Sequence, residues 1–531
     1  TGTGATSDFN DIYVDKGNSA ASVIDFNLSN FTFQGGTTYP GIFLTNGTFR
    51  LSSSQNLIFA TADYTIPSTA CLSVNGGTLN QTAGNLFLNG KLEVLNGTIN
   101  IGTGATDNNI EYAASGTPTI LVQGSGVLNV RGQIRRNAIA STGALVYSQA
   151  GTSTVTIGIS FASTNNRGVF EIANNSGSSF TMSGGTLTLV RPQGTPSIAA
   201  LFLQPATYNV TGGTIQLGNA SSAAGQTFLI NATCPVYNLT VGTSAITQTA
   251  QLSINPITIY GILTINGNSI FNTNGLNVTI GGNLVNNNTN ATNGLTVGGY
   301  RPSVPGQITT FNSSTLNQFI TGTGTNVTCF ANLSIANTAS GGSVSLSANS
   351  KIYVYSTLTI SSGTFNDGGN TVSSRENIVN NSTHASTGSG KIILMGTTTQ
   401  NISGGGAFGN IEINNTTSIN LLSNITINGT LTLTSNPALL DIGIYNLLLG
   451  TSATISGYTA AKRINTSGAS SDGGISKVFA GSLTGASFTF PVSGAGSYTP
   501  VNFTITTGAT GGTATIIPVN ALHPNATGAG A

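Results

Sequence analysis

Short runs in which apolar and polar residues alternate extend along most of the chain. Examples are Leu86-Phe87-Leu88, Ile99-Asn100-Ile101 and Leu187-Thr188-Leu189. A period of two residues is typical of strands, and no segment shows the sustained i, i+3, i+4, i+7 apolar spacing of a helix. Gly-containing turns, such as Asn96-Gly97 and Gly184-Gly185, separate the runs and allow positive φ. The pattern therefore predicts an all-β protein.

The spacing of these turns favours a β-solenoid over a row of hairpins. Neighbouring turn sequences are about 20 to 30 residues apart in several places, whereas hairpin arrays repeat their turns every 8 to 12 residues. We therefore expect an elongated, right-handed parallel β-solenoid. An antiparallel sandwich array is the alternative.

The same sequence repeat occurs three times between Val236 and Gly450. Its first strand carries Asn238, Asn332 or Asn410, and a second strand follows at a similar interval in each copy, at Leu263, Leu358 and Leu431. Such a period indicates stacked units that bury their apolar faces only against one another. The recurring Asn side chains are expected at turns or in ladders that hydrogen-bond along the solenoid axis.

The chain is predicted to have three parts. Residues 1–40 form an N-terminal arm that contains a strand, residues 41–460 form the solenoid, and residues 461–531 form an antiparallel, β-sandwich-like cap. The clearest repeats within the solenoid are 232–325, 326–405 and 406–455.

Composition limits the partners and the chemistry. Charged residues make up 5% of the 531 residues and the net charge is +1, so we expect no nucleic-acid partner. No apolar run approaches the ~18 residues of a membrane span. Cys71, Cys234 and Cys329 lack the spacing of a zinc site, although Cys234 and Cys329 could pair if their repeats are neighbours. No cofactor or metal site is expected.

The ionisable residues argue against catalysis. No Asp or Glu occurs between Glu171 and Asp367, and Glu111 is expected in a turn. A polysaccharide-cleaving β-helix enzyme, which would need carboxylates, Arg or Lys on one face, is therefore a lesser alternative. The two His residues are expected in polar surface loops.

Two further patterns have weak functional interpretations. The basic cluster of Arg131, Arg135 and Arg136 could bind a partner's carboxylates, but a charged strand edge is the preferred interpretation. Thr pairs such as Thr186/Thr188 and Thr430/Thr432 are too irregular in sequence to predict the flat Thr array of an ice-binding solenoid.

Asn-x-Ser/Thr sequons occur throughout the chain and make it a candidate glycoprotein. The candidate glycosylation sites are Asn30, Asn46, Asn96, Asn231, Asn277, Asn326, Asn424 and Asn502.

The repeat pattern of residues 232–450, together with Phe490-Pro491-Val492 and Tyr498-Thr499-Pro500-Val501, resembles the secreted, repeat-rich surface proteins and adhesins of Bacteroidetes. The resemblance covers about half of the chain and rests on low-complexity motifs. It implies an extracellular or cell-surface location.

These observations lead to a functional hypothesis, a secreted, non-enzymatic structural protein that polymerises head to tail into an extracellular filament. The N-terminal strand would complete the C-terminal β module of the next copy. A monomeric adhesin stalk that binds glycan or a cell surface is the alternative. The residues predicted to mediate assembly are Ile24, Phe26, Leu28, Phe31, Phe33, Phe488, Phe490, Val501, Phe503 and Ile505.

Overall fold

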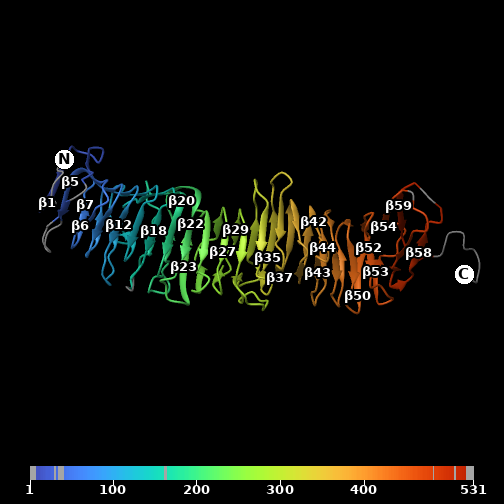
Figure 1. The fold of residues 1–531 in the computed structure, drawn as a ribbon. Helices are drawn as coiled ribbons and strands as arrows, with labels where there is room; N and C mark the ends of the chain where they lie inside the picture. Colours follow the sequence, from blue (N-terminus) through green and yellow to red (C-terminus); the bar gives the residue numbers. More distant parts are fainter. Residues whose placement is uncertain are drawn as a thin grey trace, which may run out of the picture. The chain divides into compact units, whose positions relative to one another are not determined.

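The computed structural model describes residues 7–28, 31–33, 41–160, 164–481, 483–507 and 510–521. These ranges contain no helix, hence no helix able to cross a membrane, and about 49% of the chain is strand. Parallel strands stack as a β-solenoid with about 19 turns (Figure 1). The predicted parallel solenoid is confirmed, and the alternative of an antiparallel sandwich array is wrong. The chain divides into unit 1, Thr1–Val278, and unit 2, Thr279–Ala531.

Unit 1 places three strands in most coils, so its stacked strands form three faces. The first face contains β5 (Ile42–Leu51), β8 (Ala70–Val74), β11 (Lys91–Val94), β14 (Thr119–Val122), β17 (Val146–Gln149) and the first halves of β20 (Ser179–Leu189) and β22 (Thr207–Leu217). The second face contains β6 (Asn56–Ala60), β9 (Thr78–Gln81), β12 (Thr98–Ile101), β15 (Val127–Val130), β18 (Thr154–Ile157), the second halves of β20 and β22, β24 (Asn238–Val241) and β27 (Leu263–Ile265). The third face contains β7 (Tyr64–Ile66), β10 (Leu86–Leu88), β13 (Ile110–Tyr112), β16 (Ile134–Arg136), β19 (Phe170–Ile172), β21 (Leu201–Leu203), β23 (Gln226–Ala232), β25 (Gln248–Leu252) and β28 (Ile270–Asn272).

The two-residue period of the sequence sorts side chains between core and surface. In β12, Ile99 and Ile101 are buried while Thr98 and Asn100 point outward. Ile99 stacks in register between Leu79 and Leu128 of the neighbouring coils. Burying each such side chain contributes about 1.5 to 3 kcal/mol, so a column of them supplies much of the stability of the stack. The Gly turns behave as predicted, since Gly97 has a φ of 106°.

Unit 2 is also built from three sets of stacked strands. One set contains β30 (Leu284–Asn286), β33 (Gln318–Thr321), β36 (Ser343–Leu346), β39 (Thr364–Asn366), β42 (Thr383–Ala385), β45 (Ala407–Phe408), β48 (Ile425–Ile427), β51 (Asn446–Leu449), β54 (Gly474–Phe479) and β59 (Gly512–Ile516). The second contains β32 (Ile308–Phe311), β35 (Asn332–Ala336), β38 (Leu358–Ser362), β41 (Ile378–Asn380), β44 (Gln400–Ser403), β47 (Ile419–Leu421), β50 (Ala438–Gly443), β53 (Lys462–Thr466), β56 (Val492–Gly494) and β57 (Ser497–Tyr498). The third contains β34 (Val327–Phe330), β37 (Lys351–Val354), β40 (Thr371–Ser374), β43 (Lys391–Leu394), β46 (Ile411–Ile413), β49 (Thr430–Leu433) and β52 (Thr454–Ser456). The remaining short strands are β26 (Ile257–Ile259), β29 (Val278–Ile280) and β31 (Tyr300–Arg301).

Each copy of the predicted repeat spans several coils, and the two strands that identify it are one coil apart. These two strands are neighbours on the same face in every copy, with Leu239 opposite Leu263, Leu333 opposite Leu358, and Ile411 opposite Leu431. The interval between the two predicted strands is therefore one turn of the solenoid.

The recurring Asn side chains connect successive coils, as predicted. Asn410 Nδ2 donates to the carbonyl of Gly390 (2.8 Å), one coil back, and Asn410 Oδ1 accepts from the N–H of Thr430 (2.8 Å), one coil ahead. Asn332 makes the same two contacts, with the carbonyl of Gln307 (3.0 Å) and the N–H of Thr357 (3.1 Å). Each amide thus satisfies backbone groups that a turn would otherwise leave unpaired.

The N-terminal segment forms four short strands, β1 (Ser7–Phe9), β2 (Ile12–Asp15), β3 (Val23–Phe26) and β4 (Phe31–Phe33). β2 and β3 both pair in parallel with β5 of the same chain, and β1 pairs with β4. The strands β2 and β3 of the predicted arm are therefore stacked on the first coil of their own solenoid.

At the C-terminal end, parallel coiling continues beyond residue 460 because β53 and β56 remain in the stack. The chain then switches to antiparallel pairing, in which β59 covers β54 and β57 covers β56. The strands β55 (Ser487–Phe490) and β58 (Val501–Thr504) form a separate antiparallel pair.

Candidate functional site

The most regular outward surface in unit 1 is on its second face, and we call it the Thr/Asn surface. It consists of two columns of outward side chains, two residues apart in each strand, from β9 to β27. The first column is Thr78, Thr98, Val127, Thr154, Thr186, Thr214 and Asn238. The second column is Asn80, Asn100, Asn129, Thr156, Thr188, Gln216, Thr240 and Thr264. Neither column contains a charged residue, and most of these side chains are half-exposed.

An amide ladder runs along part of the second column. Asn80 Nδ2 donates to Asn56 Oδ1 (2.6 Å), Asn100 Nδ2 donates to Asn80 Oδ1 (2.8 Å), and Asn129 Nδ2 donates to Asn100 Oδ1 (2.9 Å). Asn80 Nδ2 also donates to the carbonyl of Leu57 (3.2 Å), whereas each ladder bond of Asn100 and Asn129 uses one N–H of the donating amide and leaves the second N–H for a ligand. The ladder also fixes the orientation of the side chains before anything binds.

The Thr pairs of two neighbouring coils are aligned on this surface. Thr154 and Thr156 lie directly opposite Thr186 and Thr188, although the other coils mix Thr with Asn, Gln or Val. The turns between these strands differ in length while the strands stay in register. Residues that are unevenly spaced in the sequence are therefore evenly spaced on the surface.

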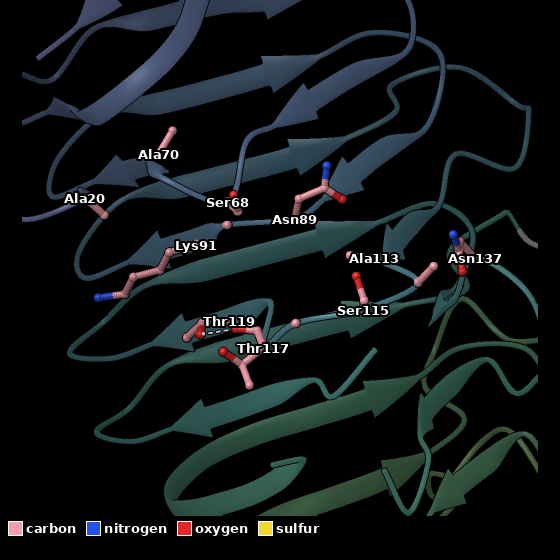
Figure 2. Close-up of a pocket in the computed structure, with 13 residues that line it drawn as sticks. Ala20, Ser68, Ala70, Asn89, Lys91, Ala113, Ser115, Thr117, Thr119 and Asn137 are labelled. Carbon is pink, nitrogen blue, oxygen red and sulfur yellow. Dashed lines mark hydrogen bonds between the residues drawn. The ribbon is translucent and has the colours of Figure 1, made fainter. Parts of the chain in front are cut away.

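A groove of about 710 Å³ crosses the turns between the third and first faces of unit 1 (Figure 2). Its polar lining includes Ser68, Asn89, Ser115, Thr117 and Asn137, with small Ala and Gly residues between them. In Figure 2, Lys91 and Asn137 lie toward opposite ends of the groove.

The Lys91 cation of this groove is already paired with a carboxylate that it shares with Arg50. Lys91 Nζ lies 2.6 Å from Glu93 Oε1, and Arg50 contacts Glu93 Oε2 at 3.0 Å. Burial tends to raise the pKa of Glu93, but hydrogen bonds from Lys91 and Ser73 and the nearby cations outweigh it and hold that pKa below its usual range. The groove therefore offers mainly neutral polar contacts.

The basic cluster predicted from sequence is an ion-pair network on the third face. Arg135 pairs with Glu111 at 2.5 Å, and Arg136 pairs with Glu171. Their strand, β16, lies between β13 and β19, so the expectation of a strand edge is wrong. The expectation that Glu111 lies in a turn is also wrong, because it belongs to β13. Arg131 does not join this network, since its Nε donates to Ser160 Oγ at 2.9 Å.

Glu171 lies beside a cavity of about 170 Å³ whose lining includes Arg136, Phe202, Asn231 and Ser253. The carboxylate is buried, and burial raises its pKa above the usual range despite the Arg136 guanidinium. Arg136 also lies over the Phe202 ring, 5.8 Å from its centroid. Because the positive charge of Arg136 balances the negative charge of the buried carboxylate, we interpret the pair as a structural ion pair.

Unit 2 contains a buried pair that sequence reasoning missed. His384 Nε2 lies 3.2 Å from Asp367 Oδ2, and both side chains are buried. The imidazole lies between the rings of Phe365 and Phe408, with centroid distances of 6.1 and 6.4 Å. The prediction of His384 in a polar surface loop is therefore wrong, and His523 lies outside the described residues. Across the described part of the chain, no three His, Cys, Asp or Glu side chains come together as a metal site would require.

All three cysteines are free and buried. Burial raises the pKa of the Cys71 and Cys234 thiols to about 12 and that of Cys329 to about 11. The possible pairing of Cys234 with Cys329 is not present.

The predicted N-terminal assembly residues belong to the first strands of unit 1. Ile24 and Phe26 lie in β3, Leu28 follows it, and Phe31 and Phe33 lie in β4. Phe26 stacks on Phe49 of β5 with the ring centroids 4.8 Å apart, and Phe31 is buried. These aromatic contacts are made within the same chain.

The C-terminal assembly residues belong to the antiparallel pair in unit 2. Phe488 and Phe490 lie in β55, Val501 and Phe503 lie in β58, and Ile505 follows β58. Phe490 is buried, whereas the other four are half-exposed.

The sequons differ in accessibility. Asn96, Asn277, Asn424 and Asn502 are exposed and Asn46 is half-exposed, while Asn30 lies outside the described residues. Asn231 and Asn326 are buried, and Asn326 Nδ2 donates to the carbonyl of Asn286 at 3.0 Å. A glycan on either buried Asn would have to displace such internal contacts.

No protein-family model, no curated protein and no solved structure matches this chain.

Proposed function

We propose that the protein is an extracellular, non-catalytic surface protein of the repeat-rich adhesin type, which contacts neutral glycans through the sides of its coils. The observation that carries this proposal is the uncharged Thr/Asn surface, whose outward hydroxyl and amide groups follow successive coils. Ion pairs such as Lys391–Glu412, at 2.7 Å, and Arg135–Glu111 neutralise charges within the stack. Hydroxyl and amide groups are left to make external contacts, and these are the groups that hydrogen-bond uncharged sugars.

The ion pairs argue against a glycan-cleaving enzyme. Glycoside hydrolysis needs two carboxylates on either side of one bond, with one of them protonated. Glu93, Glu111 and Glu412 are each held by Lys or Arg, and the described lining of the cavity beside Glu171 contains no second carboxylate. A carboxylate that is committed to a cation in this way is not free to act as an acid or a base.

A binding assay at two salt concentrations tests this proposal. The purified chain is applied to immobilised neutral polysaccharides (a β-glucan, a mannan and chitin) and to an acidic polysaccharide. Binding to at least one neutral polymer should persist at 1 M salt, because screening weakens charge contacts and leaves neutral hydrogen bonds nearly unchanged. Binding to none of the neutral polymers, or binding only to the acidic one, would refute the proposal.

A second candidate function is a head-to-tail filament, and the edges of the terminal strands favour it. Among the described strands, β3 pairs only with β5, and β59 pairs only with β54. An unpaired strand edge is a template for another strand. Sedimentation velocity and negative-stain images should show polymers that disappear when residues 1–35 are deleted. Polymers that survive the deletion would exclude this route of assembly.

A further inference from the structure

The Thr/Asn surface repeats the same chemistry in every coil. From β9 to β24, seven successive strands each have two side chains at outward positions, and all but Val127 are Thr, Asn or Gln, although Thr188 is buried. Parallel strands are about 4.8 Å apart, and outward side chains in one strand are about 7 Å apart. The surface is therefore a lattice in which most coils present a pair of hydrogen-bonding groups.

We propose that this surface binds one extended chain of a neutral polysaccharide, running along the solenoid axis with one sugar per coil. The inference rests on the proposed glycan-binding function and names its site. An extended, equatorially linked pyranose chain advances by slightly more per sugar than the roughly 4.8 Å between strands, so a short run of successive sugars can follow successive coils. Alternate sugars of such a chain turn opposite edges toward the surface, but both edges carry hydroxyls, and the side chains of each coil can donate to them or accept from them.

The side chains are organised for such contacts. The ladder bonds of Asn100 and Asn129 hold their amides in fixed orientations, which reduces the ordering needed on binding. Thr154, Thr186 and Thr214 continue the other column with hydroxyls that donate and accept. The absence of charge in both columns suits a neutral polymer and gives no advantage to an acidic one.

Ice is the other regular, neutral partner that a Thr lattice could bind. Its repeating surface would require the same methyl and hydroxyl groups in each coil. Only the coils of β18 and β20 have Thr at both outward positions, whereas the others mix Thr with Asn, Gln or Val. A mixture of amides and hydroxyls matches the hydroxyl groups of a sugar better than it matches the regular surface of ice.

The test uses two pairs of substitutions in the same two coils. Thr154→Lys with Thr186→Lys places bulk and charge on the Thr/Asn surface, where these residues are register partners. Ser148→Lys with Thr181→Lys makes the same change on the first face, where these residues are also partners. All four side chains are half-exposed or exposed. Circular dichroism verifies that both variants retain their β-structure.

Binding is measured by calorimetry with β-1,4-linked gluco-oligosaccharides and manno-oligosaccharides of two to ten sugars. The affinity of the wild-type chain should rise with the length of the oligosaccharide up to about seven sugars and then level off, because each added sugar contacts one more coil. The Thr154/Thr186 variant should bind the longest oligosaccharides at least about tenfold more weakly, and the Ser148/Thr181 control should match the wild-type chain.

Each other outcome overturns the inference in a distinct way. Affinity that levels off at one or two sugars, or equal losses in both variants, would place the glycan site elsewhere and leave the proposed function standing. Binding of no glycan in either assay would remove the proposed function as well. Arrest of ice growth without glycan binding would identify the surface as an ice-binding lattice.

Discussion

His384 offers the sharpest test of the packing of unit 2, because one atom of its ring is the polar neighbour of a buried carboxylate. The change to make is His384→Phe. It preserves an aromatic ring between Phe365 and Phe408 but removes Nε2, which lies 3.2 Å from Asp367 Oδ2. The substitution therefore separates the polar contact from the volume of the side chain.

The expected loss follows from what remains around Asp367. Its Oδ1 keeps the N–H groups of Gly369 (3.0 Å) and Thr387 (3.2 Å), while Oδ2 loses the imidazole. Oδ2 and Nε2 are within ion-pair distance but are not aligned as a hydrogen bond, so we expect a loss of about 1 to 3 kcal/mol, the cost of a buried polar atom that loses its polar neighbour. Adding Asp367→Asn removes the buried charge, so the double variant should lose at least about 1 kcal/mol less than the sum of the single variants.

Hydrogen exchange measured by mass spectrometry is the appropriate assay. Solenoids open coil by coil, so a local opening free energy is more informative than one global unfolding transition. Peptides covering Gly369 and Thr387 should exchange faster in His384→Phe, while peptides of unit 1 should exchange at the wild-type rate. If His384→Phe protects these amides as well as the wild-type chain does, or if the two substitutions are additive, the buried pair contributes nothing specific and the reasoning fails.

Further predictions concern charge, pH and thiol reactivity. Arg136→Ala leaves the Glu171 carboxylate buried without its cation and should destabilise the coils around β19 by about 3 to 5 kcal/mol. Urea denaturation measures this loss. Arg131→Ala breaks no ion pair and should cost less than about 1 kcal/mol in the same assay. Burial tends to raise the pKa of Asp367, but the close contact with His384 and hydrogen bonds from Ser386, Gly369 and Thr387 outweigh this effect and lower that pKa. The stabilisation that the ionised Asp367 provides is therefore complete above the unfolded-state pKa of about 3.9, and it is lost as the pH falls through the lower folded-state pKa. Amide exchange corrected for its intrinsic pH dependence should therefore show local loosening only below about pH 4, and Asp367→Asn should abolish that dependence. The Cys71 thiol, whose pKa is raised by burial to about 12, should react with a disulfide reagent at pH 8 only after denaturation, and rapid labelling of the folded chain would contradict its burial.

The parallel solenoid could be predicted from sequence because its physical cause is local. The alternation of apolar and polar residues in a segment such as Thr98–Ile101 predicts which side chains are buried, and the Gly turns predict where each strand ends. The repeated Asn332 and Asn410 could be assigned to axial hydrogen bonds for the same reason, since each satisfies backbone groups of the adjoining coils. His384 carried a similar signal that was overlooked. It occupies the inward position of β42, in register with Phe365.

The ion-pair network could not be predicted because it depends on the lengths of individual coils. Glu111 lies 24 residues before Arg135, but Glu171 lies 35 residues after Arg136. Both distances correspond to one step along the stack, and the longer coil places its extra residues in a connecting segment. A fixed period applied to the sequence would have paired Arg136 with the wrong residue.

The same variability explains why a regular surface can arise from an irregular sequence. Thr154, Thr186 and Thr214 are unevenly spaced along the chain, yet all three lie in one column. Register is fixed by the buried side chains on either side of the column, since a slip of one residue would turn Leu187 outward and Thr188 into the core. The apolar core therefore determines the positions of the outward groups, while the turns are free to vary in length. A surface built in this way can keep a constant spacing for a repeating polymer even where the sequence retains no visible repeat.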